Sequence, residues 1–317
     1  MSLTTIPVVD LSLFTHGNEA EKRRFVHELG NAFEEFGFVS VKNHGVSQEL
    51  IDNYYAAVKA FFALPSDTKR SYEIVELAGQ RGYTSFGREQ AKGYDTPDLK
   101  EFWQMGQTVE DNDAIKAEYP DNVQVNEVPA FDELGLKLYR SFERCGIDLL
   151  RAIAIHLGIG EFYFDQYVHN GNSILRAIHY PPITQEPKNA IRAEQHEDIN
   201  LITLLVGASA DGLQLLTKEN EWADITAPEG CFVVNVGDML QRLTNNQLKS
   251  TTHRVVNPPR EKWNTPRYSI PFFTHPKSTM RLDCLENCIT DQNPLTYAPI
   301  TAGEYLDERL REIGLKK

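Results

Sequence analysis

The chain has 317 residues, a net charge of −13 and a pI near 5.2. Hydrophobic residues make up 41% of it and charged residues 24%, which is typical of a globular protein that buries a substantial core. The negative balance argues against nucleic acid and anionic membrane surfaces as partners.

The sequence shows no pattern typical of a signal peptide, a membrane span or a cysteine-based zinc site. The N-terminus, Met1 to Pro7, lacks the basic start and apolar run of a signal peptide, and no stretch is long enough for a membrane span. Of the four cysteines, Cys145 and Cys231 lie in apolar patterns, whereas Cys284 and Cys288 are too isolated for a zinc site. We therefore expect a protein of the reducing cytoplasm.

The first 125 residues predict a helical part with short strands. Apolar residues at helical spacing predict a helix from Glu19 to Phe36, ended by Gly37. Ser47 is the expected N-cap of a second helix, which Pro65 ends after about Leu64. Short strands are expected at residues 6–10, 38–41 and 101–105.

Residues 66–99 are polar and rich in glycine, so we expect a long loop there. Three of its side chains, Tyr83, Phe86 and Arg88, are candidates for contacting a substrate. Packing of such residues against the body of the protein is the commoner outcome.

The remainder, from residue 126 to 317, predicts one long helix followed by a series of strands. The helix, Pro129 to about Ile155, carries an apolar stripe that is expected to be core. A final helix is expected from Gly303 to Ile313. Strands separated by glycine and proline are expected at residues 173–180, 201–206, 213–216, 231–236, 255–256 and 267–273.

A candidate metal site is spread over these strands. His196 and Asp198 precede the strand at 201–206, and on extended backbone residues two apart project from the same face, with Glu197 pointing away. His253 comes 55 positions after Asp198, as expected for a neighbouring strand. Two imidazoles and one carboxylate on one side of an octahedral ion are typical of non-haem Fe(II) oxygenases.

A candidate carboxylate clamp follows on the last strand. Arg267 and Ser269 are again two residues apart, so a guanidinium fork and a hydroxyl share one face. On the same segment Phe272 is a candidate for lining the substrate side, although core packing is the commoner role for such a residue. Gln241 is a further candidate for that side.

These motifs together resemble the isopenicillin N synthase-like branch of the Fe(II)/2-oxoglutarate-dependent dioxygenases, and the resemblance covers most of the chain. It rests on residues 6–10, 37–45, 196–198, 211–214, 235–238, 248–255 and 267–273.

The resemblance implies a mainly β fold with helices: a double-stranded β-helix, or jelly-roll, core backed by N-terminal helices. It implies Fe(II) as the metal, held by His196, Asp198 and His253. It also implies 2-oxoglutarate as co-substrate and O2 as oxidant, with the distal carboxylate of 2-oxoglutarate on Arg267 and Ser269.

Tyr180 stands where the family has a tyrosine that assists this clamp. Plant members often carry asparagine two positions earlier, where this chain has Ile178, so one polar group is absent from the expected pocket. His179 is expected on the opposite side of the strand, in a structural role.

We therefore expect a single domain over residues 1–317, with a helical N-terminal part (1–125) and a long helix plus jelly roll (126–317). Its expected activity is the hydroxylation or desaturation of a small molecule with release of succinate and CO2. Three alternatives stay open: a same-fold Fe(II) oxidase that does not use 2-oxoglutarate, a zinc hydrolase, and a metal-binding jelly roll without turnover. The substrate and the oligomeric state are not encoded in any pattern we find.

Overall fold

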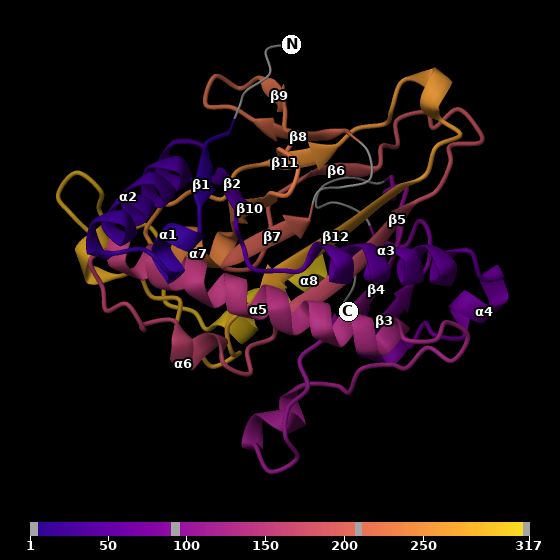
Figure 1. The fold of residues 1–317 in the computed structure, drawn as a ribbon, viewed down its shortest axis with the longest axis horizontal. Coiled ribbons are helices and arrows are strands. Elements are labelled where there is room, and N and C mark those ends of the chain that lie inside the picture. The colour runs from indigo at the N-terminus through magenta and orange to yellow at the C-terminus, as the bar shows by residue number, and fades with distance from the viewer. Residues whose placement is uncertain (1–5, 90–95, 207–210, 313–317) are drawn as a thin grey trace.

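The computed structural model describes residues 6–89, 96–206 and 211–312 (Figure 1). The strands of these segments are β1 (Val8–Asp10), β2 (Phe38–Lys42), β3 (Gly82–Thr84), β4 (Glu101–Gly106), β5 (Ile174–Tyr180), β6 (Ala193–His196), β7 (Ile202–Val206), β8 (Leu213–Leu216), β9 (Trp222–Asp224), β10 (Phe232–Val236), β11 (His253–Val255) and β12 (Arg267–Thr274). The α-helices are α1 (Ser12–Thr15), α2 (Glu19–Glu35), α3 (Gln48–Phe62), α4 (Ser66–Arg70), α5 (Phe131–His156), α6 (Asp165–Val168), α7 (Asp238–Leu243) and α8 (Ala302–Glu312).

Two sheets form the double-stranded β-helix that the family resemblance implied. The larger sheet has eight strands in the order β1-β2-β10-β7-β12-β5-β4-β3, and the smaller has four in the order β6-β11-β8-β9. In the larger sheet β12 lies between β7 and β5 and is antiparallel to both. In the smaller sheet β11 lies between β6 and β8. The strands that carry His253 and the clamp residues are therefore central rather than at an edge.

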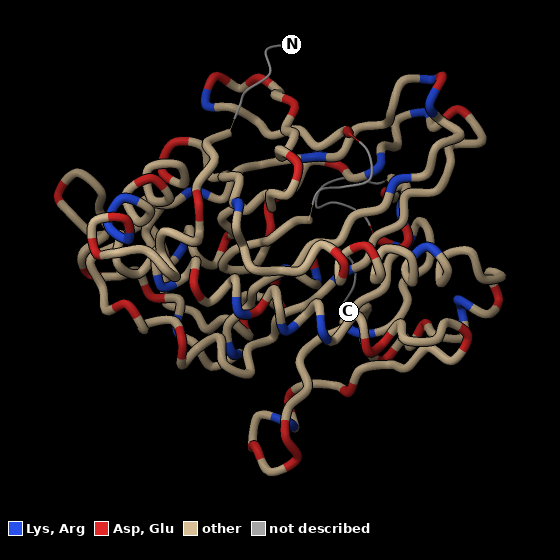
Figure 2. Tube along the Cα trace, in the orientation of Figure 1, with Lys and Arg blue, Asp and Glu red and all other residues tan. Residues whose placement is uncertain are grey.

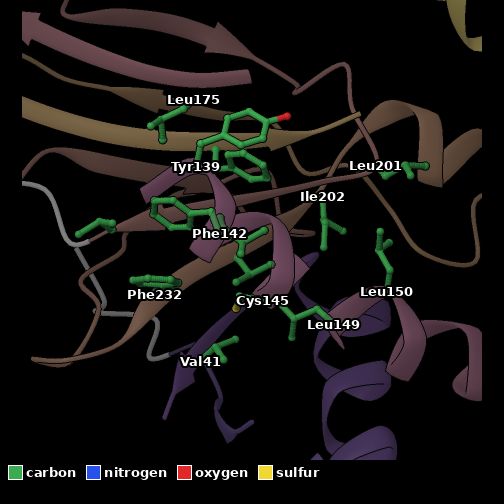
Figure 3. Close-up of a cluster of buried hydrophobic side chains, with 14 of the residues drawn as sticks. Val41, Tyr139, Phe142, Cys145, Leu149, Leu150, Leu175, Leu201, Ile202 and Phe232 are labelled. Atoms are coloured by element: carbon green, nitrogen blue, oxygen red, sulfur yellow. The ribbon is translucent and has the colours of Figure 1, made fainter. Parts of the chain in front are cut away.

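The long helix α5 runs across the larger sheet and closes its outer face (Figure 1). Its buried stripe includes Phe142, Cys145 and Leu149, as predicted, and these pack among strand residues such as Leu175 and Phe232 (Figure 3). Helices α2 and α3 pack against α5 in turn. Burial of this stripe, rather than intrinsic helix propensity, is what holds so long a helix in place.

Side-chain caps mark the first turns of both long N-terminal helices, α2 and α3. Ser47 Oγ accepts a hydrogen bond from Leu50 N, as expected for the N-cap of α3. Asn18 caps α2 in a capping box with Glu21, a signal that we did not read from the sequence.

The prediction of an uninterrupted loop at residues 66–99 is wrong. Its described part contains α4, a 3-10 turn and β3, which pairs with β4. These elements are too short to produce a visible periodicity. The same holds for β9 and α7, which the sequence also did not indicate. The end of the expected last helix, Ile313, lies outside the described residues.

One hydrophobic cluster unites both parts of the chain, since Phe25 and Val58 from the N-terminal helices belong to the same buried set as Leu204 and Phe272 from the sheet. We therefore propose that residues 1–317 form a single domain. Lys and Arg are interspersed with Asp and Glu along the trace (Figure 2). None of the described helices has the length and apolarity that crossing a bilayer requires.

A buried ionic network centred on Glu101 anchors β4 in the larger sheet. Glu101 accepts hydrogen bonds from Lys69 Nζ at 2.8 and 2.9 Å and from Tyr83 Oη, and its carboxylate lies 2.7 Å from His179 Nδ1. Burial alone would raise the pKa of Glu101, but the bonds from His179, Lys69 and Tyr83 lower it. His179, stacked on Tyr268, thus has the structural position expected for it.

Replacing Glu101 by glutamine is expected to lower the free energy of unfolding by about 3–5 kcal/mol, because Lys69 would remain buried without a counter-charge. Urea denaturation at neutral pH measures this, with the exposed Glu219→Gln as control. Since the pKa of Glu101 is lowered, its contribution is present at neutral pH and is lost as the pH falls through that lowered pKa. The difference between wild type and variant should therefore shrink in acid, and a constant difference would contradict this role.

Candidate metal centre and its cavity

The three predicted metal ligands lie together although they are far apart in the chain. His196 ends β6 and His253 begins β11, and the two residues are direct partners in the smaller sheet. Asp198 Oδ1 is 4.0 Å from His196 Nε2 and 3.9 Å from His253 Nε2. One ligand atom from each residue lies within 4.8 Å of the other two. Asp198 itself lies in the segment between β6 and β7, and not on extended strand as the spacing had suggested.

Backbone carbonyl groups orient both imidazoles. His196 Nδ1 lies 2.7 Å from the carbonyl oxygen of Glu194, and His253 Nδ1 lies 3.1 Å from that of Thr251. Because a carbonyl can only accept, each Nδ1 carries the proton and each Nε2 keeps its lone pair. Both lone pairs face Asp198.

The carboxylate of Asp198 is fixed through its other oxygen. Oδ2 accepts hydrogen bonds from Thr203 Oγ1 at 2.6 Å and Asn235 Nδ2 at 2.8 Å, which turns Oδ1 toward the imidazoles. Burial by itself would raise the pKa of Asp198, but His253, His196 and these hydrogen bonds lower it. Burial, and next the neighbouring His253, lower the pKa of His196 to about 4.

This donor set fits a divalent transition-metal ion. Two neutral imidazoles and an ionised carboxylate are the protonation states that a metal requires of its ligands. Hydrogen bonds to the far atom of each ligand, as seen on His196, His253 and Asp198, are typical of metal sites. A metal held by these three residues alone would keep further coordination positions for reactants.

Thr203 lets the orientation of Asp198 be tested. In Thr203→Val the side chain keeps its shape but loses the hydrogen bond that it donates to Asp198 and the one that it accepts from Asn200 Nδ2 at 3.0 Å. Because the first of these orients the ligand, we expect metal affinity to fall about 10- to 100-fold. Anaerobic titration with Fe(II) measures the affinity. The exposed Thr226→Val is the matched control and should leave the affinity unchanged. An equal affinity in both variants would show that Thr203 does not orient the ligand.

A cavity of about 410 Å³ opens beside the three ligands, within the range of small-molecule sites. Alternate residues of β12 form one wall of it, as the period of a strand requires. These wall residues are Arg267, Ser269, Pro271, Phe273 and His275, the last of which directly follows the strand.

The predicted carboxylate clamp lies at one end of this wall. Arg267 is 1% exposed and pairs across the sheet with Tyr180, whose ring centroid is 5.0 Å from the guanidinium carbon. A second buried arginine, Arg192, is 6.0 Å from the same ring. Burial, and then the nearby Arg267, lower the pKa of Arg192 to about 10. Two cations beside one phenol favour a carboxylate at this end of the cavity.

A buried polar cluster on the cavity wall was missed by the sequence analysis. Lys100 Nζ lies 2.7 Å from both Glu89 Oε1 and Asp98 Oδ2, and Arg176 Nη1 lies 3.3 Å from Glu89 Oε2. Burial would raise the pKa of Glu89, but Arg176 and Lys100 lower it to about 2. The available signal was Arg176, a charged residue inside the mainly apolar strand at 174–180.

The substrate-side candidates named from the sequence do not line this cavity. Tyr83 is buried against Glu101, Phe86 is 50% exposed, and Arg88 is paired with Glu73. Phe272 packs between Phe142 and Tyr139 in the core, the commoner role for such a residue.

Gln241 does not line the cavity either. Its side chain instead accepts a hydrogen bond from Ser250 N. The last helix, α8, contributes more than expected, since Leu306, Arg309, Leu310 and Glu312 line the cavity. Tyr305 Oη joins this helix to Asp238 Oδ2 at 3.1 Å.

Comparisons with known proteins agree with this architecture. Residues 6–129 match the N-terminal family described as non-haem dioxygenase in morphine synthesis, and residues 171–276 match the 2OG-Fe(II) oxygenase superfamily. The chain is 30% identical over 311 residues to the 2-oxoglutarate-Fe(II) type oxidoreductase hxnY of Emericella nidulans, covering 95% of this chain and 88% of that protein.

Two crystal structures are similar over nearly the whole chain. A 2OG-Fe(II) oxygenase family protein from Caulobacter crescentus is 45% identical, with a TM-score of 0.88 over 98% of this chain and 100% of its own. A full-length Neurospora crassa protein, solved in complex with alpha-KG and thymine, is 30% identical, with a TM-score of 0.85 over 96% of each chain.

Proposed function

The chain belongs to the 2OG-Fe(II) oxygenase superfamily, and from this premise we propose that it oxidises a C–H bond of a small molecule, by hydroxylation or desaturation, with release of succinate and CO2. Its enzyme class and its cofactors, Fe(II) and 2-oxoglutarate, follow from the family. The observation that carries the reaction is the convergence of His196, Asp198 and His253 beside a cavity with a cationic far end.

In this proposal the three side chains hold Fe(II) from one side. Iron held in this way supplies the redox chemistry with dioxygen and 2-oxoglutarate. The chain contributes orientation: the carbonyl groups of Glu194 and Thr251 fix the imidazoles, and Thr203 fixes the carboxylate. A fixed set of ligands leaves the positions toward the cavity for reactants.

Arg267 and Ser269 bind the distal carboxylate of 2-oxoglutarate, and Tyr180 assists them. Support comes from their burial, from their common face on β12 and from the second arginine beside Tyr180. A buried guanidinium offers two parallel N–H donors to a carboxylate, which sets orientation as well as affinity. The keto-acid end then points along β12 toward the metal ligands.

For hydroxylation the overall reaction balances as R–H, O2 and 2-oxoglutarate giving R–OH, succinate and CO2. One oxygen atom enters the product and the other enters succinate, and the co-substrate supplies the two electrons that the substrate does not. The Neurospora crassa protein was solved with alpha-KG and thymine together, which supports a small-molecule substrate beside the co-substrate here.

The test is succinate formation from 2-oxoglutarate by the purified protein with Fe(II), O2 and a mixture of candidate small molecules. We expect succinate to require all of Fe(II), O2 and 2-oxoglutarate, and to be absent with His196→Ala. Oxidation of a candidate compound in the absence of 2-oxoglutarate would instead identify the same-fold oxidase that needs no keto acid.

A further inference from the structure

The wall formed by β12 is longer than the co-substrate site requires. Ser269 and His275 are six residues apart, or about 20 Å at the rise of a strand. In the proposed function the Arg267 end takes 2-oxoglutarate, a chain of only five carbons. Phe273 pairs with Thr203, the residue bonded to Asp198, so the end of the wall with Phe273 and His275 lies beside the metal ligands.

His275 carries a buried polar atom that has no hydrogen-bond partner among the described residues. The residue is 8% exposed and lines the cavity, and its Nδ1 is buried without a hydrogen bond to the described part of the chain. Its backbone is fixed, since His275 N donates to Ser173 Oγ at 3.1 Å. Burial lowers the pKa of His275 to about 4, so the ring is neutral at physiological pH. A buried polar atom without a partner costs free energy, which a ligand hydrogen bond would relieve.

Arg176 is held on two sides and open on a third. Its Nε donates to Gln104 Oε1 at 2.7 Å, and its Nη1 lies 3.3 Å from Glu89 Oε2. The guanidinium carbon is 4.2 Å from the ring centroid of Phe102 and 5.2 Å from that of Phe273. Nη2 makes no hydrogen bond to a described residue, and Arg176 lines the cavity. The two hydrogen bonds and the two aromatic rings therefore fix the orientation of this guanidinium, and Nη2 remains as a donor for a ligand.

The charges of the cavity lining, taken as a whole, disfavour a second anionic ligand beside 2-oxoglutarate. Among the described lining residues the cations are Lys100, Arg176, Arg267 and Arg309. The carboxyl groups are Glu89, Asp98, Glu197, Asp198, Asp238 and Glu312. The charges of Fe(II) and of 2-oxoglutarate cancel one another. A substrate carboxylate would thus be buried in a lining that is already net negative, which is costly.

The cavity must also contain 2-oxoglutarate, so its remaining volume suits a compact molecule. We propose that Arg176, Phe273 and His275 form the substrate subsite and that it takes a small uncharged ring compound with a carbonyl group and an N–H or O–H. The carbonyl accepts from Arg176 Nη2, the ring lies against Phe273, and the second polar group bonds to His275 Nδ1. This inference rests on the proposed function, because it assumes that 2-oxoglutarate occupies the Arg267 end.

The experiment measures binding of matched probes to the protein loaded with Fe(II) and 2-oxoglutarate under anaerobic conditions. Each probe pair shares a ring and differs by a carboxylate: thymine with uracil-5-carboxylate, and nicotinamide with nicotinate. We expect at least one neutral member to bind, and to bind at least about tenfold more tightly than its acid, since a buried charge without a partner is disfavoured. Failure of both neutral members to bind, or tighter binding of the acids, would overturn the proposal.

Substitution of His275 locates the bound probe. His275→Phe removes Nδ1 without breaking any described side-chain hydrogen bond, and should weaken the neutral probe about tenfold, the value of one hydrogen bond. His275→Asn restores a polar atom near that place and should recover part of the affinity. His169→Phe, an exposed histidine outside the cavity, is the matched control. Equal binding by the His275 and His169 variants would refute the assigned subsite.

Binding of 2-oxoglutarate is followed in the same samples by the visible absorption of its Fe(II) complex. If wild type shows no such complex, the proposed function itself fails. If the complex forms and the probes do not distinguish the His275 variants, only the subsite fails.

Discussion

Replacing Asp198 by alanine is expected to abolish tight iron binding and, with it, succinate formation. Residues that only hydrogen-bond to metal ligands change affinity by about 10- to 100-fold, so removal of a ligand should cost more than about 100-fold. Asp198 is the only one of the three proposed ligands that carries negative charge. Its Oδ1 lies 4.0 Å from His196 Nε2 and 3.9 Å from His253 Nε2, so it faces both imidazoles. Equilibrium dialysis with Fe(II) under anaerobic conditions measures the affinity.

Two further variants separate ligation from folding. Asp198→Asn keeps the shape of the side chain but loses the charge, and it should bind iron far more weakly than wild type while unfolding at a similar temperature. Asp291→Ala, at an exposed site, should behave as wild type. If Asp198→Ala bound iron with unchanged affinity, the metal would have to lie elsewhere, and the roles proposed for His196 and His253 would fail with it.

The parts of this site that could be predicted from sequence depend on short-range rules. Strand alternation placed Arg267 and Ser269 on one face, and the structure places both on the cavity wall. The same alternation, continued along the strand, places Phe273 rather than Phe272 on the cavity side, as the structure shows. The apolar stripe of α5 was equally clear because it recurs along a helix of 26 residues.

The parts that could not be predicted depend on contacts between distant segments. Glu89 follows a glycine-rich stretch, and the local sequence does not show that Glu89, rather than its neighbours Phe86 and Arg88, lines the cavity. Its contacts are with Lys100 and with Arg176, which is distant in the chain. The role of α8 as a cavity wall is of the same kind, because its sequence indicates only an amphipathic helix. Such residues line the cavity only because the tertiary fold brings distant segments together, and local sequence patterns do not show which segments will meet.

Replacing Arg267 by alanine is expected to raise the concentration of 2-oxoglutarate needed for half-saturation by about 10- to 150-fold. Hydrogen bonds to a charged group contribute about 1.5–3 kcal/mol, and each 1.4 kcal/mol is a factor of ten. Because Arg267 is among the most deeply buried side chains and pairs with Tyr180, water can replace little of its interaction. Anaerobic titration of the Fe(II)-loaded protein with 2-oxoglutarate measures the change, and iron affinity itself should stay as in wild type.

Arg267→Lys distinguishes charge from geometry. Lysine keeps the positive charge but lacks the planar pair of donors, so it should restore only part of the affinity. Arg281→Ala removes an exposed arginine whose partner is Asp283 and should change nothing. An unchanged requirement for 2-oxoglutarate in Arg267→Ala, in a protein that still binds iron and unfolds at the temperature of wild type, would place the distal carboxylate elsewhere. Arg192, on the other side of Tyr180, would then be the next arginine to replace.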